Sequence, residues 1–373
     1  MIYLDNAATT LIKPASVQKA MFRAMNIAAS PGRGGHVPAM RAADIVYRCR
    51  ESAARLFNVS EPERVVFTMN ATHALNIAIN SLALRGSKVL ISGYEHNSVV
   101  RPLEALGAKI IIAEAPLFDK AAALKAFKEK INGAQLVVCT HVSNVFGFIL
   151  PIYEIAELCR VHKVPLIVDA SQSAGVLDVD YERLGAAFVA MPGHKALFGP
   201  QGTGILLCGQ TGTPLLSGGS GSDSISPMMP DFLPDRHEAG THNVPGIAGL
   251  MAGINYVLDR GTENIRRYEH TLLEASAEQL SKIKGITVFH GGPGAQSGVL
   301  SILSQDHGSE ELAQQLGAEG VCVRAGLHCA PCAHRSAGTL ESGTVRLSFS
   351  PFLRLEDIRN FSAILQKLLN TKS

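Results

Sequence analysis

Short apolar runs alternate with amphipathic segments between residues 65 and 208 of this chain. The runs are rich in Val, Ile and Leu and too short for helices, as strands buried on both faces of a sheet are. Segments between most of them, such as 122–131 and 152–162, have helical periodicity. The alternation predicts an α/β domain with a mostly parallel, seven-stranded sheet. The predicted strands are VVF at 65, KVLIS at 88, KIIIA at 109, QLVVC at 135, PLIVD at 165, AFVAM at 187 and GILLC at 204.

The pattern changes after the sixth run. A turn-rich stretch, not a helical one, joins the last two runs, so we expect one edge of the sheet to be antiparallel. Residues 215–235 are rich in Gly, Ser and Pro and have no periodicity, which predicts a long loop. A loop of this length in a compact protein is usually functional or disordered.

Helical and strand patterns are mixed in the last third of the chain, which predicts a smaller α+β domain. The expected helices cover 246–260, 262–284 and 309–318, and the expected strands cover 286–290, 298–304 and 343–350. We therefore expect three parts: an N-terminal segment over 1–20, a large α/β domain over 21–255 and a small C-terminal domain over 256–373.

The composition is that of a globular protein, with 46% hydrophobic and 18% charged residues in a chain of 373. The formal net charge of +2 gives no electrostatic indication of nucleic acid or of an anionic membrane as a partner. No apolar run is long enough for a transmembrane helix, and the first ten residues do not resemble a secretory signal. We therefore expect a cytoplasmic protein of enzyme size.

Two of the seven cysteines differ from the rest in their surroundings. Cys329 and Cys332 lie in RAGLHCAPCAHR (324–335), whereas the others lie in apolar segments typical of buried thiols. The pair could be a metal clamp, a redox dithiol, or one working thiol beside a second. Its spacing is too crowded for an ordinary zinc site, and no second paired cluster exists elsewhere. Arg324, His328 and His334 could supply positive charge or a base to these thiols.

Two charged residues follow predicted strands at the edge where α/β proteins usually bind ligands. Lys195 lies in the glycine-rich MPGHKALFGPQGTG, where a desolvated amine can form a Schiff base with an aldehyde. Asp169 ends PLIVD, and its carboxylate could pair with the protonated ring nitrogen of pyridoxal phosphate. The alternatives are a surface lysine and a simple helix N-cap.

Polar residues also stand where two other strands pass into helices. Asn70, Thr72 and His73 stand at one such junction, where the free amides of the helix start and the Thr72 hydroxyl could bind phosphate. His96 follows the next strand, where its ring could stack on a planar cofactor. Helix capping by Thr72 and an ordinary loop histidine are the simpler alternatives.

Taken together, these signals resemble the fold-type I, class V pyridoxal-phosphate enzymes of the cysteine desulfurase and selenocysteine lyase family. The short cysteine loop, with Pro331 behind it, is similar to the group II branch of that family. The matching motifs run in the family's order over nearly the whole chain: YLDNAATT, NATHALN, EHNS, HVSNVFG, VDASQSAG, GHKALFGPQGTG, EAGTHNVPGIAGL, RAGLHCAP and GTVRLSF.

The resemblance implies pyridoxal 5'-phosphate as cofactor and a set of residues around it. Lys195 would form the Schiff base, Asp169 would pair with the ring nitrogen, Gln172 with the phenolic oxygen, and His96 would stack on the ring. The implied cofactor-binding residues are Ala71, Thr72, His96, Asp169, Gln172, His194, Lys195 and Thr241. Thr241 would reach the phosphate of a second subunit, which implies a homodimer.

The resemblance also implies the substrate and the reaction. L-cysteine would give L-alanine and a persulfide on Cys329, with Lys195 and His96 as the other catalytic residues, and a protein would accept the sulfur. The implied substrate-binding residues are His36, Asn144, Arg324 and Arg346. Selenocysteine lyase, or another lyase or aminotransferase of this fold, is the alternative, and a zinc or redox dithiol protein is a more distant one.

The sequence departs from the family pattern at two places. Pro192 stands where many relatives have a serine that binds phosphate, so the GGSGSDS segment (218–224) could complete that part of the site. Cys332 has no counterpart in the family motif. It could receive sulfur from Cys329 or protect that thiol as a disulfide.

Overall fold

The computed structural model describes residues 1–32, 34–292 and 294–370. Its centre is a seven-stranded sheet with the order β2-β8-β7-β6-β5-β3-β4. The strands are β2 (Val65–Thr68), β3 (Lys88–Ser92), β4 (Lys109–Ala113), β5 (Leu136–Thr140), β6 (Leu166–Asp169), β7 (Phe188–Pro192) and β8 (Gly204–Cys208). All seven predicted strands are present, and most neighbours pair in parallel, so the predicted α/β sheet is confirmed.

The antiparallel part of the sheet lies one strand in from the edge. β8 pairs antiparallel with both β7 and β2, so β2 at the edge again runs in the direction of the parallel strands. A short turn region after β7 returns the chain beside it, because no helix crosses over between β7 and β8.

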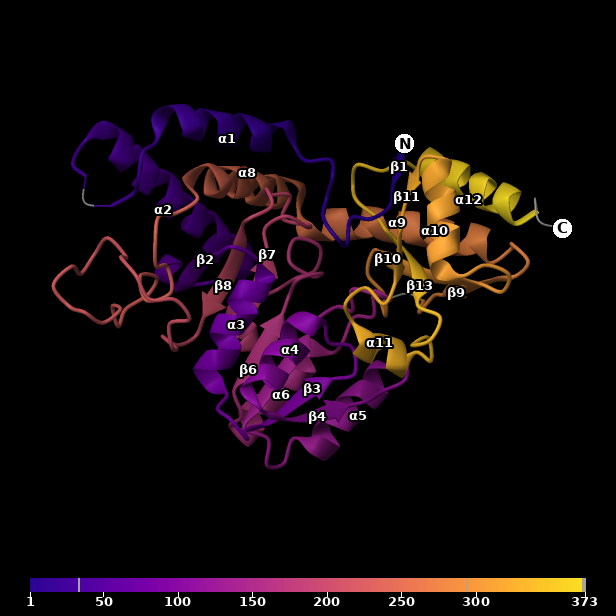
Figure 1. Ribbon diagram of the computed structural model, residues 1–373, viewed down its shortest axis with the longest axis horizontal. Coiled ribbons are helices and arrows are strands. Elements are labelled where there is room, and N and C mark those ends of the chain that lie inside the picture. The colour runs from indigo at the N-terminus through magenta and orange to yellow at the C-terminus, as the bar shows by residue number, and fades with distance from the viewer. Residues whose placement is uncertain (33, 293, 371–373) are drawn as a thin grey trace.

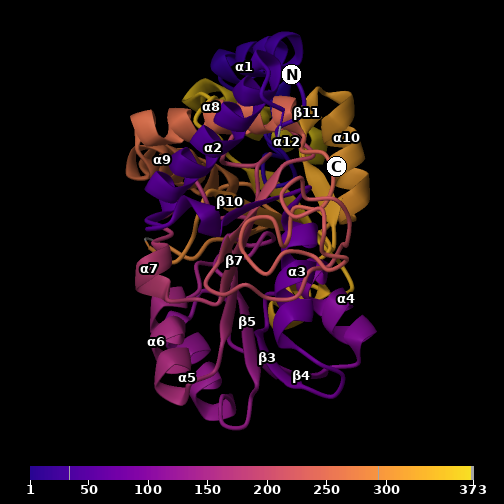
Figure 2. The same ribbon diagram turned by 90° about the vertical axis from the view of Figure 1, so that its left-hand side faces the viewer.

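Helices cover both faces of the large sheet, as the continuous apolarity of its strands requires. Figure 2 shows α3 (Ala71–Leu82) and α4 (Asn97–Leu106) on one side of the strands. The other side carries α5 (Lys120–Lys130), α6 (Ile152–His162) and α7 (Tyr181–Leu184). Alternate side chains of each strand belong to two separate apolar cores, one on each face.

The C-terminal lobe is built on an antiparallel sheet, β12-β13-β10-β9. Helices α9, α10 and α12 pack with these strands around a third apolar core, on the right of Figure 1. The predicted α+β composition of this lobe is therefore confirmed. Its elements are α9 (Thr262–Leu280), β9 (Ile286–Phe289), β10 (Val299–Ser304), α10 (Ser309–Ala318), β11 (Val321–Cys322), β12 (Arg324–Gly326), α11 (Pro331–Ser336), β13 (Thr344–Ser348) and α12 (Leu355–Asn370).

The N-terminal segment connects the two lobes. Its β1 (Ile2–Tyr3) pairs in parallel with β11, and Thr10 donates a backbone hydrogen bond to the His194 carbonyl of the large lobe. Helix α1 (Ala15–Ile27) then packs on α8 (Val244–Arg260), while α2 (Val37–Phe57) and the 3₁₀ turn η1 (Pro62–Arg64) lead into β2. The domain limits at 20 and 255 stay predictions, and they fall inside α1 and α8.

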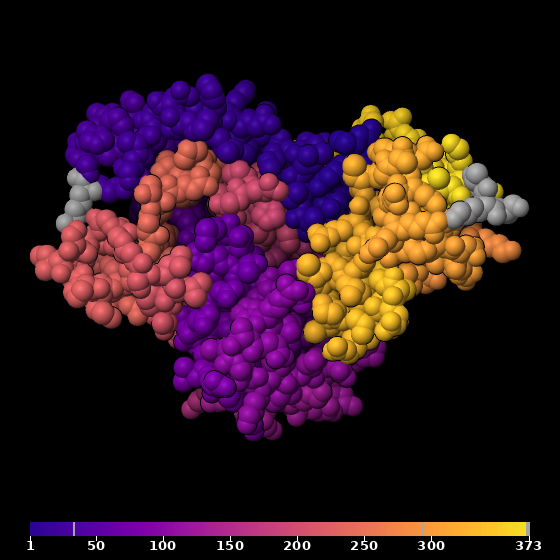
Figure 3. All heavy atoms as spheres, in the orientation of Figure 1, coloured from indigo at the N-terminus to yellow at the C-terminus, as the bar shows by residue number. Residues whose placement is uncertain are grey.

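The chain has no helix or strand between β8 and α8, so the predicted long loop is confirmed. This loop protrudes from the protein surface at the left of Figure 3, where Ile225 is 97% exposed. None of the helices in the described ranges is both long and apolar enough to cross a membrane.

A buried ion pair fixes the end of this loop to the sheet. Arg50 Nη1 of α2 donates to Glu238 Oε1 at 2.7 Å and also to the Val65 carbonyl, while the Phe67 amide donates to Glu238 Oε1 at 2.6 Å. Burial opposes ionisation of Glu238, but Arg50 and His242 outweigh it and lower the pKa of this carboxyl to about 2. The ion pair is therefore formed throughout the neutral range.

We predict that Glu238→Gln lowers the free energy of unfolding by about 3–5 kcal/mol, because it leaves the Arg50 charge buried without its partner. Urea denaturation measures this change. Glu278→Gln, which removes an exposed ion pair with Lys282, should change stability far less, because water screens both charges. The wild-type contribution of Glu238 should be lost as pH falls from about 4.5 to about 2, because in that window the unfolded chain takes up a proton while the folded carboxylate stays ionised. Equal effects of the two variants would contradict this account.

Candidate active site

Most of the predicted site residues meet in one cavity of about 210 Å³. It lies at the carboxyl ends of β5, β6 and β7 and is closed on one side by the C-terminal lobe. The register places Asp169 beside Thr140 of β5 and Ala190 of β7. Of the predicted residues, the cavity is lined by Ala71, Thr72, His96, Asn144, Asp169, Gln172, His194, Lys195, Arg324, Cys329 and Arg346.

Lys195 and Asp169 form the electrostatic centre of this cavity. Lys195 follows β7 in a turn, and burial lowers the pKa of its amine to about 8, although the Asp169 charge opposes the shift. Asp169 is 3% exposed, and its Oδ1 accepts a 2.9 Å hydrogen bond from the Ser171 amide. A fraction of Lys195 is therefore neutral near pH 8, as a nucleophilic amine must be.

His96, Ser98 and Thr72 form a short chain of hydrogen bonds along another wall. His96 is the N-cap of α4, and its Nδ1 lies 2.6 Å from Ser98 Oγ, which in turn lies 3.2 Å from Thr72 Oγ1. Burial lowers the pKa of His96 to about 4, so its ring is neutral. At the start of α3, Asn70 caps the His73 amide, and the amides of Ala71 and Thr72 are directed to no acceptor among the described residues. This helix terminus is suited to an anion.

The N-terminal segment forms the wall beside Lys195. Gln172 Nε2 donates to the Ala7 carbonyl at 3.0 Å, and Thr10 Oγ1 donates to the carbonyl of His194 at 3.0 Å. Burial lowers the pKa of His194 to about 4, so this ring is also neutral. The same short N-terminal segment therefore forms hydrogen bonds with both Gln172 and His194 and fixes their positions.

Arg346 of β13 is the C-terminal lobe's main charge in the cavity, and it is only 1% exposed. Its Nη2 pairs with Asp5 Oδ1 at 2.7 Å, and its Nη1 donates to the Asn144 carbonyl at 3.0 Å. Asn144 Nδ2 donates in turn to the His328 carbonyl at 2.8 Å. Arg324 on β12 lies opposite Arg346 in the sheet. These cations give the lobe-facing wall the charge that a carboxylate ligand needs.

Cys329 and Cys332 have different surroundings. Cys329 is exposed and lines the cavity, whereas Cys332 is 8% exposed, and burial raises the pKa of its thiol. His328 and His334 stack at 5.7 Å, and burial lowers their pKa values to about 2 and about 4. They are therefore neutral, so of the two expected roles they can supply a base to the thiols but not positive charge.

Two predicted residues lie outside the cavity of this chain. His36 is the exposed N-cap of α2, where its Nδ1 accepts from the Ala39 amide. Thr241 is exposed and borders a separate hollow beside His237 and His242. The segment 218–224 belongs to the exposed loop and does not line the cavity either.

Sequence reasoning assigned no role to several residues that the structure brings into the site. Asp5, Ala7 and Ser98 contact Arg346, Gln172 and His96 as described. Asp5 and Ala7 lie in the motif YLDNAATT and Ser98 lies in EHNS, and these motifs were the sequence signal from which the three residues could have been identified. Hydrophobic patterning carries no information on which polar neighbour such a residue will reach.

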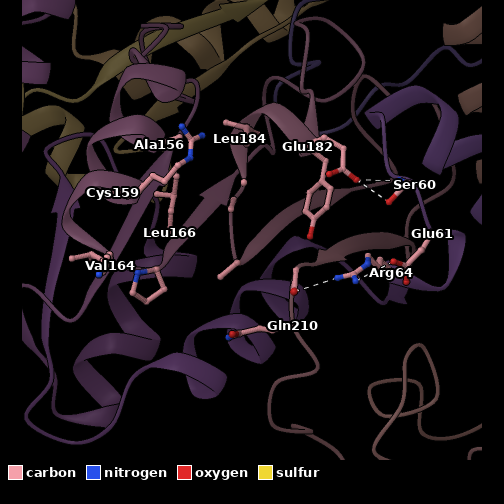
Figure 4. Close-up of a pocket in the computed structure, with 18 residues that line it drawn as sticks. Ser60, Glu61, Arg64, Ala156, Cys159, Val164, Leu166, Glu182, Leu184 and Gln210 are labelled. Carbon is pink, nitrogen blue, oxygen red and sulfur yellow. Dashed lines mark hydrogen bonds and ion pairs between the residues drawn. The ribbon is translucent and has the colours of Figure 1, made fainter.

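A separate hollow of about 750 Å³ lies at the opposite edge of the large sheet (Figure 4). Its walls include Leu166 at the start of β6 and Cys159 of α6. Glu182 and Arg64 are already bonded to neighbours there, to Ser60 Oγ at 3.0 Å and to the Gly209 carbonyl at 3.2 Å. This hollow contains none of the predicted site residues.

In the described ranges, no three His, Cys, Asp or Glu side chains are grouped so that they could hold a metal ion. The zinc alternative for the cysteine pair therefore has no ligand set in that part of the chain. What the cavity does combine is an amine of lowered pKa, a buried carboxylate, a helix N-terminus and an accessible thiol.

Comparison with known proteins gives matches over nearly the full chain. The Aminotransferase class-V family model matches residues 2–361. The chain is 33% identical to a probable cysteine desulfurase of Methanothermobacter thermautotrophicus, over 98% of this chain and 94% of that protein. It is 31% identical to a probable cysteine desulfurase of Mycolicibacterium paratuberculosis, but spans only 55% of that longer protein.

Comparison with solved structures also gives matches over nearly the full chain. The apo structure of a cysteine desulfurase from Thermococcus onnurineus has a TM-score of 0.90 and 31% identity, covering 99% of this chain and 95% of that one. A cysteine desulfurase of Escherichia coli has a TM-score of 0.87 at 24% identity, which supports the fold alone.

We predict that Cys329 is the first cysteine to react with iodoacetamide in the native protein, because Cys332 is buried and its thiol pKa is raised. Peptide mass spectrometry after short labelling measures the order. Cys329→Ser should remove the rapid label, and Cys332→Ser should leave it in place. Rapid labelling of Cys332 in the native wild type would contradict the burial described here.

Proposed function

The chain belongs to the class-V aminotransferase family, and we propose that it is a pyridoxal-phosphate-dependent cysteine desulfurase that converts L-cysteine to L-alanine and takes the sulfur onto Cys329. The observation that carries the proposal is the exposed Cys329 thiol in the same cavity as Lys195 and Arg346. A transaminase needs the amine and the carboxylate-binding arginine but has no use for a thiol there.

The residues present fit this cofactor. Asp169 Oδ1 is bonded to the Ser171 amide, and Oδ2 has no donor among the described residues, so one carboxylate oxygen is free for a ring N–H. The amides of Ala71 and Thr72, with the Thr72 hydroxyl, can hold a phosphate. Pro192 lines the cavity without a donor, so the helix terminus carries more of that role. When bound, pyridoxal phosphate supplies an aldehyde for amines and an electron-withdrawing ring.

Lys195 is the residue that moves protons. Its amine, with a pKa near 8, can take the proton from the substrate Cα and return one to carbon. The Arg346 guanidinium binds the substrate carboxylate, with Asn144 beside it, and thereby orients the Cα–H bond toward Lys195. The neutral His96 ring provides a flat wall that carries no competing charge.

Cys329 receives the sulfur. Its thiolate attacks the substrate sulfur, the new S–S bond forms as the Cβ–S bond breaks, and the carbon side is protonated to give alanine. Cys332 is too buried to share this position, so the two thiols have unequal roles. The same site would release selenium from L-selenocysteine, and this second substrate does not need Cys329 as an acceptor.

A second copy of the chain and a protein sulfur acceptor belong to this proposal. Thr241 and His36 are exposed and lie away from the cavity of their own chain, as residues that act in a partner's site would. Cys329 lies on a short loop between β12 and α11. Such a short loop cannot carry Cys329 far from the cavity, so a protein sulfur acceptor must bind at the cavity itself.

We predict that Lys195→Ala abolishes alanine formation, with a loss on the order of 10²–10⁴-fold or more, because no other amine lines the cavity among its described residues. It should also abolish the visible absorbance of the bound cofactor. Alanine assay and absorbance spectroscopy measure both effects. A yellow, active Lys195→Ala protein would contradict the assignment.

We predict that Cys329→Ala stops sulfur release from L-cysteine but retains part of the cleavage of L-selenocysteine, because only the first reaction needs a thiolate acceptor. Alanine, sulfide and selenide are measured separately with each amino acid. Cys332→Ala is the matched control and should retain both reactions. Equal loss on both substrates in Cys329→Ala would exclude the persulfide role.

A further inference from the structure

A second, much smaller cavity of about 30 Å³ lies behind Lys195, between the two lobes. It shares Ala7, Ser171, Gln172 and Lys195 with the main cavity. Most of its other walls come from the N-terminal segment and the C-terminal lobe, which contribute Asn6, Thr10, Glu269, Ser297, Gly298, Val299, Ser348 and Phe349. The mechanism described above makes no use of this space.

Glu269 is the unexplained residue of this cavity. It comes from the middle of α9, is 5% exposed, and has no hydrogen bond or ion pair with any described residue. Gly298 faces it closely, because a Cβ atom at that position would lie 2.8 Å from Glu269 Oε2. A buried carboxyl without a partner is unfavourable unless water or a reacting group satisfies it.

The cavity has the size and the lining for ordered water. About 10–15 Å³ of such space holds one water molecule, which needs two to four polar partners. Besides Glu269 and Lys195, the polar side chains that line this cavity are those of Asn6, Thr10, Ser171, Gln172, Ser297 and Ser348. Water here can therefore find polar partners in a space that both Glu269 and Lys195 line.

Lys195 and Glu269 are the only titratable side chains among the described residues that line this cavity. Burial alone raises the pKa of Glu269 to about 8, and burial is the main cause that lowers the pKa of Lys195 to about 8. Groups of matched proton affinity exchange a proton in either direction at little cost.

We propose that Glu269 is the proton-exchange partner of Lys195, connected to it through water in this cavity. In one direction the Glu269 O–H bond breaks, its proton passes to water, and water gives a proton to the neutral Lys195 amine. The products are a carboxylate and an ammonium ion, and the reverse transfer restores the starting state. Glu269 is thus a positioning residue that keeps the Lys195 proton in exchange, and this role rests on the function proposed above.

The test follows loss of deuterium from Cα-deuterated L-alanine in ordinary water, using the holoenzyme and mass spectrometry. Alanine tests proton exchange at Lys195 without any need for Cys329. Glu269→Gln should slow the loss about tenfold, less than the roughly 10²–10⁴-fold expected for a group that transfers the proton directly. Glu269→Asp, which keeps the acid, should restore part of the rate, and the exposed Glu278→Gln on the same helix should exchange like the wild type.

A second measurement needs no cofactor. If Glu269 is buried as described, the stability of the wild-type apoprotein falls as pH rises from about 4.5 to about 8, because only the unfolded chain is ionised there. Glu269→Gln lacks this titration, so its Tm should rise relative to the wild type across that window. Wild-type exchange rates in Glu269→Gln, or a Tm difference that does not vary with pH, would overturn the inference. Normal alanine exchange without alanine release from L-cysteine would overturn only the proposed desulfurase activity.

Discussion

The parallel register of β5, β6 and β7 is the constraint on which the site depends. Each strand is buried on both faces, so its side chains are packed against two layers of helices and cannot shift by one residue. The register therefore places Asp169 at the same edge as the turn that carries Lys195. The same packing removes water from that edge, and desolvation is the main cause of the lowered pKa of Lys195.

The site is complete only when both lobes and the N-terminal segment are in place. Arg346 belongs to the C-terminal sheet, but it pairs with Asp5 and donates to the Asn144 carbonyl of the large lobe. Asn6 Nδ2 donates to the Ser348 carbonyl at 2.9 Å, so the first residues of the chain hold the second lobe against the first. Small movements between the lobes would therefore change substrate binding and the Glu269 cavity together.

Backbone geometry explains why Cys329 is exposed whereas Cys332 is buried. His328 and Cys329 have φ values of 49° and 56°, in a region that non-glycine residues seldom adopt. Two successive residues in this conformation expose Cys329 at the cavity, and Pro331 then starts α11, which buries Cys332. Strain of this kind persists where surrounding contacts hold it, and it is concentrated at functional sites. The Asn97 amide, which donates to the Cys329 carbonyl at 2.7 Å, is one such contact.

The sequence by itself determined the seven strands of the large sheet and the α+β nature of the second lobe, because apolar periodicity is local. Strand-end motifs and the family resemblance together indicated most residues of the cavity. The sequence did not determine that β8 lies inside the sheet, nor that His36 lies outside the cavity, nor that Glu269 is buried beside Lys195. These features depend on which distant segments pack together. Burial and pairing between residues such as Asp5 and Arg346 arise only from that packing, so only the tertiary structure decided them.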